Sequence, residues 1–202
     1  MKKITLLLVL LTTYLSNAQE DNTTKVGFVS SFQFTFGFSN LATNKSMMGE
    51  AHKPAFPLVT GRLGVFHYNK LSLGLNASVH SMDVKKTQYY GYFDYTQAIT
   101  IGPYISYYQP LSKKSLIEPY VSYDYVNYYS NYNDKKLHSE SDGLGLGIDY
   151  QHKVGSRAYV TFGLKYSFNK MRTETNPNWE KYMNNYNFLS AKIGFTFSKN
   201  RL

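Results

Sequence analysis

Eight segments of this chain alternate apolar and polar residues, and this alternation limits the fold more than any other sequence feature. Neighbouring side chains along a β-strand point to opposite faces, so each such segment has one apolar and one polar face. In residues 26–38, VGFVSSFQFTFGF, valine and phenylalanine recur on one face and small or polar residues on the other. The eight segments are about 26–38, 57–68, 71–82, 95–108, 116–128, 143–151, 157–169 and 187–197.

The connections between these segments alternate between long and short. The long ones are about 39–56, 83–94, 129–142 and 170–186, and the short ones are 69–70, 109–115 and 152–156. Outer-membrane barrels have short turns in the periplasm, long loops outside and an even number of strands. A tilted strand needs about 9–11 residues to cross the hydrocarbon, which these segments supply. The pattern predicts an all-β fold, an eight-stranded antiparallel transmembrane up-and-down barrel.

The alternative is a soluble, lipocalin-like barrel, which would carry its apolar faces inside. That arrangement would place the charged residues of the polar faces on the outside and line the interior with phenylalanine. The polar faces also contain most of the strand glycines, as a crowded lumen requires. The 20 tyrosines and 13 phenylalanines suit the two interfaces of a membrane, where one end of a ring is apolar and the other wet. These features favour the membrane barrel.

Two prolines, Pro103 and Pro119, fall inside adjacent predicted strands. Proline cannot donate a hydrogen bond to a strand ladder, so we expect a local bulge at this place.

The N-terminus has the pattern of a secretory signal peptide. Lys2 and Lys3 precede the apolar run 4–11, and Ser16-Asn17-Ala18 provides small residues before a cleavage site after Ala18. The run is too short for a helical anchor, and a buried N-terminal helix is the alternative. Without cysteine, the chain has neither disulfides nor a lipoprotein anchor. We predict a signal peptide (1–18), a periplasmic segment (19–25), a barrel (26–197) and a periplasmic tail (198–202).

These features together resemble the small bacterial outer-membrane barrels of the OmpA/OmpX-like, "porin family" type. The resemblance is carried by the SNAQ signal end, the alternating strands and the aromatic final strand FLSAKIGFTF. The Ala-Gln junction and the Tyr/Asn/Lys-rich loops look like those of Bacteroidetes proteins. The resemblance implies export by the general secretory pathway, the barrel-assembly machinery, and a location among outer-membrane lipids and lipopolysaccharide. The chain departs from the family in that Phe197 is followed by five further residues.

Six charged residues fall on the inward, polar faces. Unpaired charge in a narrow lumen is costly, so opposite charges should pair across it. The strand directions predict a layer nearer the periplasm (Glu118, Asp149, Lys192) and a layer nearer the middle (Arg62, Asp124, Lys165). An eight-stranded barrel is only wide enough for its own side chains, which favours a polar plug over a gated ion path.

Basic residues also gather in the short turns, which hold no acidic residue. The formal net charge is +9, but an exported barrel does not meet nucleic acid, so lipid phosphate is the expected counterpart. Alternatively, these residues only keep the turns soluble. The residues with this predicted phosphate contact are Lys70, Lys113, Lys114, Lys153 and Arg157, with Lys199 and Arg201 beyond the last strand. The long loops mix lysine and tyrosine, either as solvated loops or as a surface for lipopolysaccharide, a glycan or a protein.

No convincing catalytic or metal site is found in the sequence. Lipid A deacylases carry a histidine and a serine two residues apart, whereas Ser141 follows His138 by three and Ser81 is adjacent to His80. The five histidines lie on separate elements, so no metal or cofactor is expected. The sequence predicts a non-enzymatic barrel with a structural, adhesive or partner-binding role. The alternatives are a narrow porin or accessory barrel of a secretion or uptake complex, and a lipid A-modifying enzyme.

Overall fold

The computed structural model describes residues 26–42, 45–86, 93–132, 135–174 and 176–198. The predicted signal peptide and the segment 19–25 lie outside these residues, as do Lys199 and Arg201. Within the described residues no helix has the length and apolar character needed to cross a bilayer.

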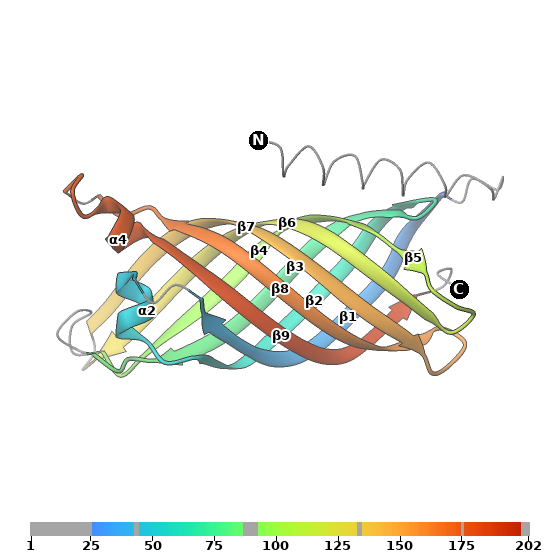
Figure 1. Cartoon of the computed structure of the whole chain (residues 1–202), viewed down its shortest axis with the longest axis horizontal. Helices are drawn as coiled ribbons and strands as arrows, with labels where there is room; N and C mark the ends of the chain where they lie inside the picture. Colours follow the sequence, from blue (N-terminus) through green and yellow to red (C-terminus); the bar gives the residue numbers. More distant parts are fainter. Residues whose placement is uncertain (1–25, 43–44, 87–92, 133–134, 175, 199–202) are drawn as a thin grey trace.

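Eight long strands form the wall of a closed barrel (Figure 1). A ninth, β5 (Gln109–Pro110), is a two-residue extension beside β6. The long strands are β1 (Val26–Leu41), β2 (Ala55–Tyr68), β3 (Leu71–Asp83), β4 (Tyr95–Tyr107), β6 (Ser115–Tyr132), β7 (Lys135–Lys153), β8 (Ala158–Met171) and β9 (Asn185–Ser198).

Every long strand is antiparallel to both of its neighbours. The hydrogen-bonded order is β4-β3-β2-β1-β9-β8-β7-β6, and a β4–β6 pairing closes the ring. One end of the barrel carries the short turns, the start of β1 and the end of β9, and we call it the turn end (Figure 1). The other carries the short helices α2 (Met47–Ala51) and α4 (Glu180–Asn184), and we call it the helix end. The predicted eight-stranded up-and-down barrel is confirmed.

The apolar faces of the strands point outward and the polar faces point into the lumen. In β9, Leu189, Ile193 and Phe195 are about half exposed, whereas Ser190 and Thr196 are buried. The same alternation runs around the wall, so the outside is an apolar belt and the inside is polar. This distribution is the reverse of a soluble lipocalin-like barrel and matches a protein surrounded by lipid.

The wall is taller on one side than the sequence predicts. Residues 129–142 were expected to form a long loop, but β6 continues to Tyr132 and β7 starts at Lys135. Because β7 pairs with β8 only from Ser141 onward, residues 135–140 pair with β6 alone. Apart from Leu137, residues 135–140 are polar, so this segment has ladder pairing without the alternation that marks a strand in lipid.

The bulge predicted near Pro103 and Pro119 is wrong. Pro103 lies opposite Leu75 in a continuous register with β3, and Pro119 likewise fits the β6–β7 register. The β4–β6 ladder skips Gly102 and Pro103 and resumes in the same register, and Asn76 Nδ2 donates to the Gly102 carbonyl at 2.8 Å. The missing donors are therefore tolerated without an inserted residue.

A register shift occurs instead in β2, between Gly64 and Phe66. One extra residue reverses the faces beyond it, so Phe66 lies opposite the outward Leu73 while His67 is buried in the lumen. The sequence alternation had placed Phe66 inside, because alternation alone does not reveal a bulge.

Candidate functional site in the barrel lumen

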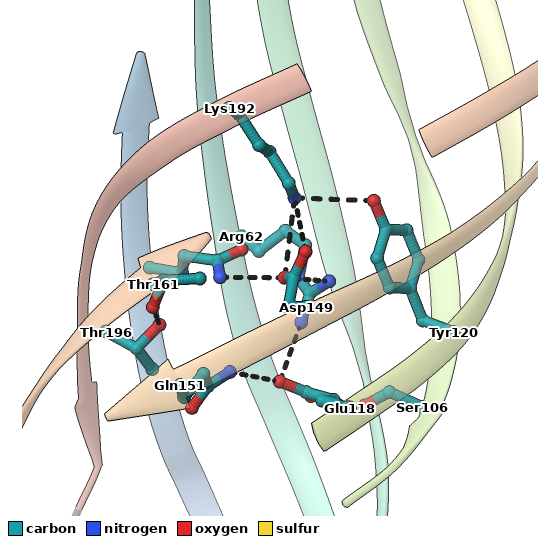
Figure 2. A network of polar contacts seen from close by, with 10 residues as sticks. Arg62, Ser106, Glu118, Tyr120, Asp149, Gln151, Thr161, Lys192 and Thr196 are labelled. Carbon is teal, nitrogen blue, oxygen red and sulfur yellow. Dashed lines mark hydrogen bonds and ion pairs between the residues drawn. The ribbon is translucent and has the colours of Figure 1, made fainter. Parts of the chain in front are cut away.

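Arg62 of β2 lies at the centre of a buried charge network in the turn-end half of the lumen (Figure 2). Its Nη2 is 3.0 Å from Glu118 Oε2, and its Nη1 is 3.0 Å from Asp149 Oδ2. The guanidinium carbon lies 4.7 Å from the ring centre of Tyr104 and 4.3 Å from that of Tyr120. A planar cation that meets two carboxylates and two aromatic faces is held in one orientation.

The two carboxylates have further donors, from strands beside Glu118 and from across the lumen for Asp149. Glu118 accepts hydrogen bonds from Ser106 Oγ at 2.7 Å and Gln151 Nε2 at 2.6 Å. Asp149 accepts one from Gln33 Nε2 at 2.8 Å. These contacts offset the cost of removing the carboxylates from water, which is the condition under which buried charges are tolerated.

Lys192 of β9 adds a second cation on the far side of Asp149 (Figure 2). Its Nζ lies 3.2 Å from Asp149 Oδ1 and donates to Tyr120 Oη at 3.3 Å. The network therefore contains two cations, Arg62 and Lys192, and two anions, Glu118 and Asp149, so its formal charge is zero. The side chains come from β2, β6, β7 and β9 and together bridge the lumen.

The remaining predicted pair, Asp124 and Lys165, stands apart from this group. Lys165 Nζ is 2.6 Å from Asp124 Oδ2, and Lys165 is the more exposed of the two. Arg62 was expected in their layer, but its contacts are to the acids of the layer nearer the turns. The register explains this, since Arg62 lies opposite Gln33, whose own amide reaches Asp149.

Glycines on the polar faces make room for these side chains. A Cβ on Gly147 would lie 2.1 Å from the Tyr120 ring, and one on Gly163 would lie 2.2 Å from Asp149 Oδ1. Inward glycines in residues 143–151 predict room for side chains from the opposite wall of the barrel. The structure differs, because Tyr120 is the direct cross-strand neighbour of Gly147 and its ring folds over the adjacent strand.

The helix-end half of the lumen is filled by a different kind of layer, which we call the cap. Met48 and Ala51 of α2 are fully buried, and the aromatic side chains of Tyr128, Tyr186 and Phe188 pack in the same cluster. The other members are Leu41, Ala55, Met82, Ala98, Val126 and Met171.

Hydrogen bonds fix the polar atoms of the cap. The Tyr128 and Tyr186 hydroxyls lie 2.5 Å apart, and Tyr186 donates to Ser141 Oγ at 2.7 Å. His52 follows α2, with Nδ1 at 3.1 Å from the Met48 carbonyl and Nε2 at 2.9 Å from Thr96 Oγ1. Burial lowers the pKa of His52 to about 4, so the imidazole is neutral in the folded cap near neutral pH.

A small cavity of about 50 Å³ lies between the cap and the charge network. Leu58 and Phe188 line it on the cap side and Arg62 and Lys165 on the network side. His80 also faces it, buried, with neither ring nitrogen hydrogen-bonded within the protein. At about 10–15 Å³ per water, the cavity has room for a few water molecules.

The five basic residues predicted to meet lipid phosphate all lie at the turn end. Lys70 follows β2, Lys113 and Lys114 precede β6, Lys153 ends β7 and Arg157 precedes β8. Lys113, Lys114 and Arg157 are exposed. Within the described part of the chain, no ion pair involves these three residues. Their contact with lipid stays a prediction.

The turn end also holds a serine–histidine contact that the sequence did not suggest. Ser115 Oγ lies 2.9 Å from His152 Nδ1 and 3.0 Å from Tyr150 Oη. The β6–β7 register brings Ser115 opposite His152, although 37 positions separate them. Among the described residues no carboxylate pairs with His152, and no group of three potential metal ligands is found.

Comparisons with known proteins agree on the architecture. No protein-family model and no curated protein sequence matches the chain. Among solved structures, Neisserial surface protein A is similar with a TM-score of 0.63 at 12% identity, covering 86% of this chain and 99% of that one. OprG of Pseudomonas aeruginosa matches with a TM-score of 0.53 at 13% identity, over 84% of this chain and 96% of that one.

The N-terminal β-barrel domain of Pseudomonas aeruginosa OprF matches with a TM-score of 0.50 at 9% identity, over 87% of this chain and all of that domain. Identities this low establish the fold alone. With the apolar belt and the closed ring of strands, they identify the chain as a small eight-stranded β-barrel with the fold of integral outer-membrane proteins.

Proposed function

We propose that the protein is a non-enzymatic outer-membrane barrel with a sealed lumen, which acts through its surface in a structural, adhesive or partner-binding role. In this proposal the barrel-assembly machinery inserts it with the turn end in the periplasm and the helix end outside. The supporting observation is the double filling of the lumen by the charge network and by the cap. Ions would have to displace both layers, and the cavity between them has room for only a few waters.

Conductance measurements on the purified full chain in planar bilayers test the sealed lumen. The wild-type protein should give no current steps. A variant with Arg62, Glu118, Asp149 and Lys192 all changed to serine should stay silent as well, because the cap still closes the helix end. Regular current steps from the wild-type protein would instead support the narrow porin.

A lipid-modifying enzyme is the second candidate, and the Ser115–His152 contact favours it. A histidine beside a serine hydroxyl is the start of a nucleophile–base pair. Mass spectrometry of lipid A and phospholipids from cells that express the wild type or Ser115→Ala decides between the candidates. The non-enzymatic proposal expects identical lipid profiles. A mass change that depends on Ser115 would replace it with the enzyme.

A further inference from the structure

An open groove of about 570 Å³ lies on the outside of the barrel at the helix end, across β7, β8 and β9. Its lower part is apolar, because Leu144 and Phe168 line it from adjacent strands with 49% and 47% exposure. The next outward pair toward the helix end is Asp142 opposite Lys170. Over two residues along β7 and β8, the outer surface changes from apolar to charged side chains. The groove therefore crosses the boundary between the apolar belt and the aqueous rim.

Lysines from three separate elements line the polar part of this groove. Lys45 precedes α2, Lys170 is near the end of β8 and Lys181 belongs to α4. Lys170 Nζ pairs with Glu180 at 2.8 Å, whereas neither Lys45 nor Lys181 has an ion pair among the described residues.

The acidic residue in the groove is already neutralised. Asp142 receives two hydrogen bonds from Arg172, at 2.6 Å from Nε and 2.7 Å from Nη2. Asn185, exposed and opposite Lys170 on β9, adds an uncharged amide to the rim. The groove thus combines two uncompensated cations, amide donors and an apolar floor.

We propose that this groove binds a phosphorylated glycolipid of the lipid A type from the outer leaflet. An acyl chain would lie against Leu144 and Phe168, and a phosphate would lie between Lys45 and Lys181. Lysine ammonium groups bind phosphate as point charges, and an apolar floor directly below them selects an amphiphile over a free anion. The inference rests on the proposed outward orientation of the helix end.

Trp179, the only tryptophan of the chain, reports on this site. It directly precedes α4 and lies two residues before Lys181, is 61% exposed and lies edge-to-face with Tyr182. The full chain, folded in phosphatidylcholine nanodiscs, is titrated with bisphosphorylated lipid A while Trp179 fluorescence is recorded. Parallel titrations use dephosphorylated lipid A, the deacylated phosphorylated disaccharide, phosphatidylglycerol and inorganic phosphate.

The double variant Lys45→Gln/Lys181→Gln should bind lipid A at least about tenfold more weakly, since each lysine near an anionic surface contributes about 1 kcal/mol. The wild type should show a similar loss toward dephosphorylated lipid A and toward the deacylated disaccharide. Lys113→Gln/Lys114→Gln removes the same charge from the turn end and should leave the affinity unchanged. Native mass spectrometry of the eluted complexes provides a second readout.

Equal affinity of the wild type and Lys45→Gln/Lys181→Gln for lipid A would overturn the inference. Equal binding of phosphatidylglycerol would reduce the groove to a general anionic-lipid contact, and displacement by inorganic phosphate would reduce it to a free-anion site. Either result would exclude a groove that is specific for a phosphorylated glycolipid. Folding is verified in each sample by the mobility difference between unheated and heated protein on gels. A folded barrel that ignores lipid A rejects the groove alone, whereas current steps reject the sealed lumen alone.

Discussion

The two halves of the lumen are closed by different physical means. In the turn-end half, four charged side chains with a formal charge of zero meet in the network around Arg62. In the helix-end half, Met48 and its neighbours form an apolar cap, with hydroxyls paired around Tyr186. The network is built entirely from residues within long strands, whereas the cap depends on α2, a segment between strands. The network is therefore part of the wall, whereas the cap combines residues of the wall with a helix that is added to it.

This difference predicts that damage to the network weakens the whole barrel, whereas damage to the cap opens only one end. A buried ion group that loses one member leaves uncompensated charge in a ring of strands that unfolds as a unit. A short helix can detach from the barrel without breaking any ladder.

The largest effect is expected for Arg62→Met, which leaves Glu118 and Asp149 buried without their shared cation. The loss should be about 3–5 kcal/mol of unfolding free energy, measured by urea titration in lipid vesicles. Lys53→Met removes one member of an exposed pair, whose side chains are 58% and 68% accessible, and should cost less than about 1 kcal/mol. Similar losses in both variants would contradict a network that supports the wall.

The outer face of the same wall gives the next largest effect. Leu146 points outward between Val121 and Tyr166, so Leu146→Arg should cost roughly 2–4 kcal/mol near the middle of the membrane. Ser122→Ala, on the lumen side of the adjacent strand, should cost much less in the same urea titration. A barrel that tolerated Leu146→Arg as well as Ser122→Ala would not have lipid on this face.

Met48→Ala tests the cap alone. The side chain is fully buried, and truncating a buried methionine costs at least about 2 kcal/mol. This loss should weaken mainly the packing of α2 against the barrel. Trypsin should cleave faster after the exposed Lys45, which lies just before α2, while the unheated barrel keeps its mobility on gels. Met47, only partly buried beside the cluster, supplies the matched control Met47→Ala. Loss of the gel shift in Met48→Ala would mean that the cap and the wall unfold together.

Acid should loosen the cap through His52. Burial, the largest influence, lowers its pKa from 6.5 to about 4, with a smaller contribution in the same direction from Lys85 and an opposing one from the Met48 carbonyl. Between these pH values the detached segment binds a proton that folded His52 does not, so cap stability falls as the pH drops from 6.5 toward 4. Amide exchange in residues 47–51, corrected for intrinsic rates, should rise over this range.

Replacing His52 with glutamine should remove most of that pH dependence, because no proton is then taken up at this position. His138→Gln, at an exposed histidine on the β6–β7 hairpin, should preserve it. Identical pH profiles for wild type and His52→Gln would show that another group controls the cap.

The smallest effect is expected at the turn end. Changing Lys113, Lys114, Lys153 and Arg157 to glutamine should lower refolding yield in anionic vesicles and not in zwitterionic ones. Each residue contributes about 1 kcal/mol at most near an anionic surface. Equal yields in both lipids would leave these residues as solubilising groups only.

The sequence was sufficient for the wall because lipid imposes alternation on every strand that crosses it. The lumen-facing charged residues could be predicted for the same reason, since Glu118, Asp149 and Lys192 occupy polar-face positions between apolar neighbours. Alternation does not record an inserted residue, so the shift after Gly64 and the burial of His67 were missed.

The cap was missed because Met48 and Ala51 lie in a connection, where alternation carries no information, and Tyr186 falls in the predicted loop 170–186. Tyr128 and Phe188 lie at the ends of predicted strands, but alternation does not show that an apolar layer fills that end of the lumen. One local signal was present, since Ser46 precedes two methionines and caps α2 by accepting a hydrogen bond from the Gly49 amide at 3.1 Å. That signal predicts the start of a helix. Nothing in the sequence indicates that the Met48 side chain of this helix is buried inside the barrel.

The uneven height of the wall separates residues that can change without altering the barrel from residues that cannot. Residues 135–140 form a ribbon that is paired to β6 alone and makes no ladder with β8. Substitutions within residues 135–140 therefore change the surface at the helix end without altering a strand pairing of the apolar belt. The ring of strands, with its neutral group of charges, does not depend on them.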